Sequence, residues 1–141
     1  MIKRVLAAVD GSDPSLKAVR MAAEMARQFG ARLTLVHVVP RLLLPPDVYG
    51  LTIATVEREH RAYAEGVLQG AIEAVRGPGL EVNTSILFGP PAECIAEEAA
   101  AADVGLVVVG SRGHGAVARV FLGSVSDRLA HICSKPVLVV H

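Results

Sequence analysis

A glycine-rich stretch in the last third of the chain holds the residues best suited to bind an anion. Four glycines fall within residues 110–123, and glycine lets the backbone turn with positive φ and bring its N–H groups close to a ligand. The stretch leads into Gly123 and Ser124 at the start of an expected helix, where free N–H groups and the helix dipole favour phosphate. The same residues also fit a tight turn and an S-x-x-D capping box from Ser124 to Asp127, and the two uses can coexist.

Two common nucleotide motifs do not explain this stretch. A Walker A loop needs Gly-Lys-Ser/Thr after four residues, and Gly110 is followed instead by Gly115-Ala116. The spacing Gly113-x-Gly115-x-x-Ala118 satisfies a relaxed dinucleotide fingerprint. That fingerprint also needs an acidic residue about 20 positions further on at the end of the next strand, where this chain reaches His141. A nicotinamide dinucleotide site is therefore not expected.

Asp10 is the acidic residue most suited to a ligand, because it directly follows the first expected strand. A carboxylate can accept hydrogen bonds from both hydroxyls of a ribose and is poorly matched to a polyphosphate. The alternative is that Asp10 only forms an Asx turn. His37 lies in an apolar strand and is expected to be a hydrogen-bonded core residue, while His60 and His131 lack the spacing of metal ligands.

The elements that must position these residues alternate between strand and helix. Asp13 is expected to cap the first helix, with Pro14 at its first position and Gly30 as its C-cap. Such alternation predicts right-handed crossovers and a parallel sheet with helices on both faces, and ligands of these sheets bind beyond the carboxyl ends of the strands. The strands are expected over residues 2–9, 33–39, 80–87 (nearer an edge), 104–109 and 136–140, and the helices over 13–30, 53–71, 90–102 and 124–133.

Length and composition indicate one ordinary domain over residues 1–141. Apolar residues make up 52% and charged residues 20%, which excludes a disordered chain. Fourteen basic and fourteen acidic residues are interleaved without a basic patch, so no nucleic-acid partner is expected. No uncharged apolar run approaches 18 residues, which argues against a membrane span. Cys94 and Cys133 are expected to be small buried apolar side chains. The expected location of the protein is the reducing cytoplasm.

The chain resembles the universal stress protein A family. Gly110-x2-Gly113-x9-Gly123-Ser124 matches the family's signature G-2x-G-9x-G-[S/T], which marks its ATP-binding subgroup. Residues 5–12 look like the family's first strand and acidic turn, and residues 35–38 and 134–140 look like its second and last strands. The resemblance implies an α/β fold: a single domain with an open, twisted, parallel five-stranded sheet of order 3-2-1-4-5, Rossmann-like and similar to the adenine nucleotide alpha hydrolases.

The resemblance also implies a cofactor, ATP with Mg²⁺, and a role for each matching position. Arg112 is the least specific of these positions, because a solvated loop arginine explains it nearly as well. The implied contacts are Asp10 with the ribose, Ala8 and Val9 with the nucleoside, the Val38 backbone with the adenine edge, Gly110, Arg112 and Gly113 with the ribose and phosphates, and Gly123, Ser124, Val125 and Ser126 with the terminal phosphates.

Three functions are compatible with this pattern. The first is an ATP-binding stress-response protein that acts as a nucleotide-dependent switch with an unidentified protein partner and hydrolyses ATP slowly at most. The second is an ATPase or nucleotidyl transferase that needs a partner, since Asp10 is the one carboxylate near the expected site and the loop has no lysine. The third is a structural dimer that binds no nucleotide.

A homodimer is expected through the last strand. Residues 137–140 are uncharged and apolar, and an open strand edge of this kind tends to pair with another strand. The family resemblance independently suggests dimers joined at this strand. The competing account is that the loop over residues 41–51 covers this edge within one chain.

Overall fold

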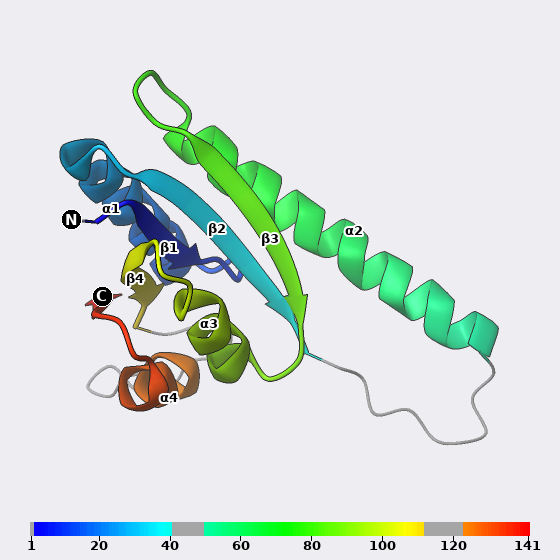
Figure 1. The fold of residues 1–141 in the computed structure, drawn as a ribbon. Coiled ribbons are helices and arrows are strands. Elements are labelled where there is room, and N and C mark those ends of the chain that lie inside the picture. The colour runs from blue at the N-terminus through cyan, green and yellow to red at the C-terminus, as the bar shows by residue number, and fades with distance from the viewer. Residues whose placement is uncertain (1, 41–49, 112–122) are drawn as a thin grey trace.

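Five parallel strands form one sheet in the order β3-β2-β1-β4-β5 (Figure 1). The structure is a computed structural model that describes residues 2–40, 50–111 and 123–141. This sheet confirms the α/β fold and the edge position of β3 predicted from the sequence pattern, and the strand order that the family resemblance implies. The elements are β1 (Arg4–Ala8), α1 (Asp13–Phe29), β2 (Arg32–Val39), α2 (Gly50–Val75), β3 (Val82–Phe88), α3 (Pro91–Ala99), β4 (Val104–Gly110), α4 (Ser124–Ile132) and β5 (Val137–Val140).

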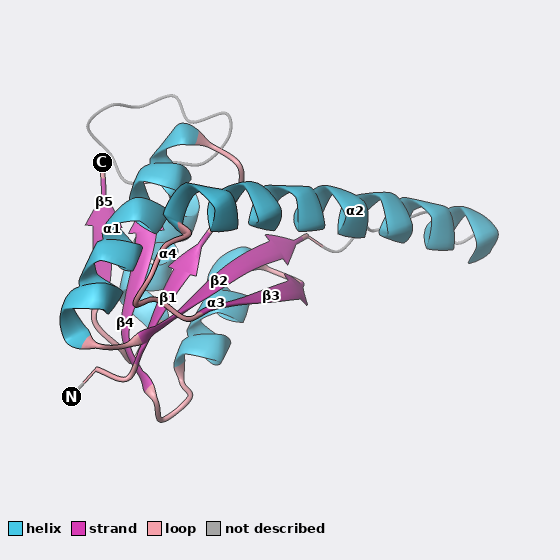
Figure 2. Cartoon of the chain, turned by 90° about the horizontal axis from the view of Figure 1, so that it is seen from above, coloured by secondary structure: helices cyan, strands magenta, loops and turns pink. Residues whose placement is uncertain are grey.

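The helices cover both faces of the sheet, α1 and α2 on one and α3 and α4 on the other (Figures 1 and 2). Successive strand residues point to opposite faces, so β1 contributes Val5 and Ala7 to the first core and Leu6 to the second. All three are fully buried. Burial on both faces explains why the central strands are continuous apolar runs. Among the described helices, none is long and apolar enough to cross a membrane.

The first turn of α1 differs from the expected cap. Ser12, not Asp13, is the N-cap, and its hydroxyl accepts a hydrogen bond from the Ser15 backbone N–H at 3.3 Å. Both residue types can cap a helix, but here Ser12 has the extended backbone that a cap needs, with φ −78° and ψ 160°. Asp13 instead lies in the first turn, where its charge complements the helix dipole. Gly30 is the C-cap with φ 65°, as expected.

Helix α2 is the longest element and runs past the end of the sheet. Its buried residues are Ala64, Leu68, Ala71 and Val75, which face the first core. Figure 2 shows the N-terminal half of α2 projecting beyond β2 and β3. This half therefore lies beside the carboxyl ends of the strands rather than over the sheet.

An ion-pair cluster joins the amino ends of β1, β2 and β4. Arg4 donates to Asp103 Oδ1 at 3.1 Å, and Arg32 donates to Asp103 Oδ2 at 2.6 Å. The hydrogen bond from the Arg4 guanidinium lowers the pKa of Asp103 below its usual value of 3.8. A carboxyl group with a lowered pKa in the folded state stabilises the fold above its unfolded pKa and loses this effect as the pH falls through the folded pKa.

Asp103→Asn should therefore lower the melting temperature at neutral pH and have little effect in strong acid. The amide keeps the shape of the side chain and loses the charge that attracts both arginines. Thermal melts of both proteins between pH 7 and pH 2 provide the measurement, and the gap between their melting temperatures should close below about pH 4. A gap that stays constant down to pH 2 would show that the charge of Asp103 contributes nothing.

Candidate functional site

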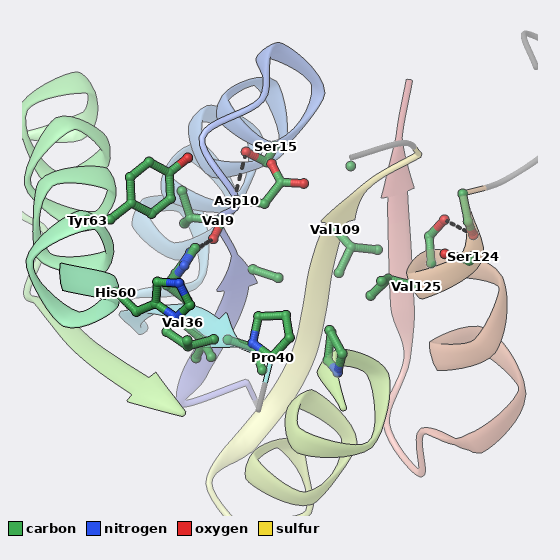
Figure 3. A pocket seen from close by; sticks show the side chains of 18 residues that line it. Val9, Asp10, Ser15, Val36, Pro40, His60, Tyr63, Val109, Ser124 and Val125 are labelled. Carbon is green, nitrogen blue, oxygen red and sulfur yellow. Dashed lines mark hydrogen bonds between the residues drawn. The ribbon is translucent and has the colours of Figure 1, made fainter. Parts of the chain in front are cut away.

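A cavity of about 620 Å³ opens at the carboxyl ends of β1, β2 and β4 (Figure 3). Because β2 and β4 flank β1 on opposite sides, this is the point where the strand order reverses and where open α/β sheets place their ligands. Arg112 and Gly113, two of the predicted site residues, lie outside the described residues. The other nine all line the cavity: Ala8, Val9, Asp10, Val38, Gly110, Gly123, Ser124, Val125 and Ser126.

Asp10 lies at the mouth of the cavity between β1 and α1. Its Oδ1 accepts a hydrogen bond from the Ser12 backbone N–H at 2.8 Å and another from the Ser12 hydroxyl. The Asx turn that the sequence allowed is therefore present. Within the described part of the chain, Oδ2 has no hydrogen-bond partner, so this oxygen can still accept from a ligand. The turn and a ligand contact are compatible.

The N-terminus of α4 faces the same cavity and is uncapped. Gly123 is the N-cap, and no side chain in the described part of the chain hydrogen bonds to the first turn, so the expected Ser124–Asp127 capping box is wrong. The box fails because Ser124 is already helical, one position too late to cap. Among the described residues, nothing accepts from the backbone N–H groups of Ser124, Val125 and Ser126. Three free donors at a helix N-terminus form an anion-binding arrangement.

The two glycines at the ends of the loop have different roles in the backbone. Gly123 has φ −65° and ψ 159°, an ordinary extended conformation, so its backbone does not require glycine. Gly110 requires glycine for close packing: a Cβ there would lie 2.8 Å from the Pro14 carbonyl carbon and 2.9 Å from the Ser15 nitrogen. The end of β4 thus packs directly against the first turn of α1.

The two serines of α4 are not equivalent. Ser126 is buried, and its hydroxyl donates to the carbonyl oxygens of Ser111 and Gly123, both at 3.1 Å. This hydroxyl fixes α4 to the end of β4, so Ser126 can offer an anion only its backbone N–H. Ser124 is exposed at the cavity wall and can offer both its hydroxyl and its backbone N–H.

Three ring side chains line the cavity that the sequence did not assign to a site. His37 is the hydrogen-bonded core residue that was expected, with Nδ1 donating to the Val9 carbonyl oxygen at 2.7 Å, and it also reaches the cavity. His60 and Tyr63 come from α2 (Figure 3). The signal for His60 was its place four residues before Ala64, in line with the buried face of α2. Its significance depended on how far α2 extends past the sheet, which the sequence pattern does not show.

The described lining carries little charge. Asp10 is its only carboxylate, and it includes no lysine or arginine. No group of three or more His, Cys, Asp or Glu residues that could hold a metal ion occurs in the described part of the chain. The cavity therefore combines apolar walls, one carboxylate and one set of free N–H donors, which suits a ligand with an apolar ring, hydroxyl groups and an anionic end.

The fold is a Rossmann-like α/β fold with a cavity at the reversal point of its sheet. The universal stress protein family model matches residues 1–141, and the chain belongs to this family. The universal stress protein YxiE of Bacillus subtilis is 34% identical over 99% of both chains. A universal stress protein of Mycolicibacterium smegmatis is 37% identical over 97% of this chain but only 47% of its own length, so the present chain spans about half of that relative.

Solved structures show the same fold. The universal stress protein UspA of Lactobacillus plantarum has a TM-score of 0.88 at 22% identity. The match covers 99% of this chain and 98% of that one. The universal stress protein of Archaeoglobus fulgidus in complex with dAMP has a TM-score of 0.75 at 26% identity, with both chains covered completely. A universal stress protein in complex with cAMP has a TM-score of 0.73 at 26% identity, over 99% of this chain and 97% of that one.

Proposed function

We propose that this chain binds an adenine nucleotide in the cavity, ATP with Mg²⁺ in the cell, and acts in the cytoplasm as a nucleotide-dependent stress-response switch. The observation that carries the proposal is the N-terminus of α4, where three N–H groups without an acceptor among the described residues face the same cavity as Asp10. Two similar structures, each 26% identical, hold the adenine nucleotides dAMP and cAMP. Release of bound ligand from the purified protein, followed by chromatography, separates this proposal from a structural dimer without nucleotide.

The proposed arrangement follows the chemistry of the walls. The N-terminus of α4 takes the phosphates, and the free oxygen of Asp10 accepts from the ribose. The apolar wall from β1 and β2, which includes Val9, Val38 and Pro40, takes the base. Val38 offers its backbone to the adenine edge, and Gly110 lies beside the ribose with Arg112 and Gly113 next in the chain.

Hydrolysis is expected to be slow. Efficient phosphoryl transfer needs a carboxylate for Mg²⁺, a cation on the phosphates and a residue that orients the nucleophile. Asp10 is the one carboxylate of the described lining, and the proposal assigns it to the ribose. Mg²⁺ would then be held mainly by the phosphates and water, as it often is. An ATPase or nucleotidyl transferase that needs a partner is the alternative, and single-turnover kinetics with and without cell extract distinguishes the two.

Asp10→Asn should reduce the preference for ATP over 2′-deoxy-ATP. Asparagine keeps the oxygen that accepts from Ser12, so the turn is retained while the charge is lost. A hydrogen bond to a charged group contributes about 1.5–3 kcal/mol, so the affinity for ATP should fall roughly tenfold to a hundredfold. Calorimetric titration with both nucleotides provides the measurement. A variant that keeps the wild-type preference would remove Asp10 from the ribose contact.

A homodimer through β5 is part of the proposal, because the two edges of the sheet differ in character. The edge strand β3 exposes polar Asn83 and Thr84. The other edge strand, β5, is Val-Leu-Val-Val with every residue partly exposed and no charge. If β5 pairs with β5 of a second copy about a twofold axis, one contact covers the open β5 edge of both chains.

Val139→Lys should convert the dimer to monomers by placing a charge in each copy of the shared edge. Thr84→Lys is the control for the added charge, since it places the same charge at an exposed residue of the opposite edge and should leave the dimer intact. Light scattering gives the mass, and circular dichroism checks that both variants are folded. A dimer that survives in folded Val139→Lys would remove β5 from the interface.

A further inference from the structure

One wall of the cavity is built by the part of α2 that projects beyond the sheet. His60 and Tyr63 line the cavity there, and His60 continues the buried face that begins at Ala64. Where α2 lies over the sheet, this face carries Ala64, Leu68 and Ala71, which pack in the core. Where the helix leaves the sheet, the same face carries a ring side chain and meets the cavity instead.

Two ring contacts hold this part of α2 in place. The Tyr63 ring meets the His37 ring edge to face, with the centroids 6.0 Å apart and the planes at 67°. The Arg61 guanidinium lies over the Phe88 ring at the end of β3, 5.1 Å from its centroid. Edge-to-face ring pairs and cation–π pairs are both favourable. The ring wall is therefore fixed to β2 and β3 rather than held only through the helix.

His37 presents a defined tautomer to this wall. A carbonyl oxygen can only accept, so the short contact from Nδ1 to the Val9 oxygen places the proton on Nδ1. The ring is buried and cannot turn without losing this bond. His37 thus supports Tyr63 as a fixed surface.

The ring wall and the anion donors lie at opposite ends of the cavity. Figure 3 shows His60 and Tyr63 on α2 at one side and Ser124 and Val125 on α4 at the other, with Val109 between them. A nucleotide whose phosphates contact α4 therefore directs its base toward the rings. Bases bind favourably against aromatic side chains in single-stranded nucleic-acid complexes, and a purine offers a larger face than a pyrimidine.

We propose that His60 and Tyr63 form the base-recognition wall of the cavity and give it a preference for purine over pyrimidine nucleotides. This inference rests on the proposed nucleotide binding and adds the residues that select the base. Tyr63 is 56% exposed, so a base that covers its ring removes apolar surface from water without disturbing the core.

The test compares ATP with CTP in calorimetric titrations of the wild-type chain and the double variant His60→Ala with Tyr63→Ala. The wild type should prefer ATP. In the double variant the affinity for ATP should fall roughly tenfold or more, and the affinity for CTP should fall less, so that the ratio moves toward one. Tyr63→Phe keeps the ring and should keep the ratio. Glu59→Ala, an exposed change on α2 away from the cavity lining, is the matched control and should change neither affinity.

The outcomes separate this inference from the proposed function. A wild type that binds ATP with an unchanged ATP-to-CTP ratio in the folded double variant would overturn the role of the ring wall and leave nucleotide binding intact. An equal loss of affinity for both nucleotides would also overturn it, because the rings would then not distinguish a purine from a pyrimidine. A wild type that binds neither nucleotide would overturn the proposed function itself, and this inference with it.

Discussion

Ser124→Pro should weaken ATP binding roughly tenfold to a hundredfold while the protein stays folded. Proline lacks the backbone N–H, so this change removes one of the three free donors of α4, together with the exposed hydroxyl. Hydrogen bonds to a charged group contribute about 1.5–3 kcal/mol each, which gives the expected range. Proline is well tolerated at the first helical position, and the extended backbone of Gly123, with ψ 159°, is the conformation that a following proline requires.

Ser124→Ala is the matched control for this change. Alanine keeps the N–H group and removes the hydroxyl, so the difference between the two variants isolates the backbone donor. Calorimetric titration with ATP measures both, and thermal melts confirm that both are folded. Equal affinities of Ser124→Pro and Ser124→Ala would mean that this donor does not hold phosphate.

Gly110→Ala should destabilise the fold by about 1–3 kcal/mol, the usual cost of overpacking. The added Cβ would meet the Pro14 carbonyl carbon at 2.8 Å and the Ser15 nitrogen at 2.9 Å, and both are backbone atoms that cannot rotate away. Either β4 or the first turn of α1 must move. Since that turn holds Asp10 through Ser12, ATP affinity should fall as well.

Gly66→Ala in α2 is the control for Gly110→Ala. A Cβ at Gly66 meets nothing within 4 Å, and alanine is preferred over glycine inside a helix by about 0.5–1 kcal/mol. Chemical denaturation should therefore show opposite shifts for the two glycine substitutions. A stable Gly110→Ala variant would show that the contact between β4 and α1 can relax at little cost.

The strands and helices could be predicted from the sequence because each kind of element in this fold requires a simple local pattern of apolar residues. Strands buried on both faces need continuous apolar residues, as in Val104–Gly110. The helices between them show their own spacing, and α1 ends at Gly30 as expected. The capping residues of the helices were harder to predict. Ser12 and Asp13 are both good capping residues, and only the backbone conformation decides between them.

The position of the cavity could be predicted from the sequence, but the residues at its two ends could not be predicted equally well. Asp10 and the residues from Gly123 onward follow strands or open a helix, so topology alone brings them to one cavity. The ring wall was missed because His60 and Tyr63 lie far from any strand end in the sequence, and their position in space depends on the length and direction of α2. The anchoring role of the Ser126 hydroxyl was missed for a similar reason, since its partner Ser111 is fifteen residues away in sequence.

The central claim is that this cavity binds an adenine nucleotide, and calorimetric titration of the purified, nucleotide-free protein with ATP tests it most directly. The account predicts saturable binding with one nucleotide per chain, weakened in Ser124→Pro and in Asp10→Asn. Saturable binding that both folded variants retain in full would place the nucleotide elsewhere on the molecule. The absence of any binding of ATP, dAMP or cAMP to the folded wild-type chain would contradict the account and favour a structural dimer without a nucleotide.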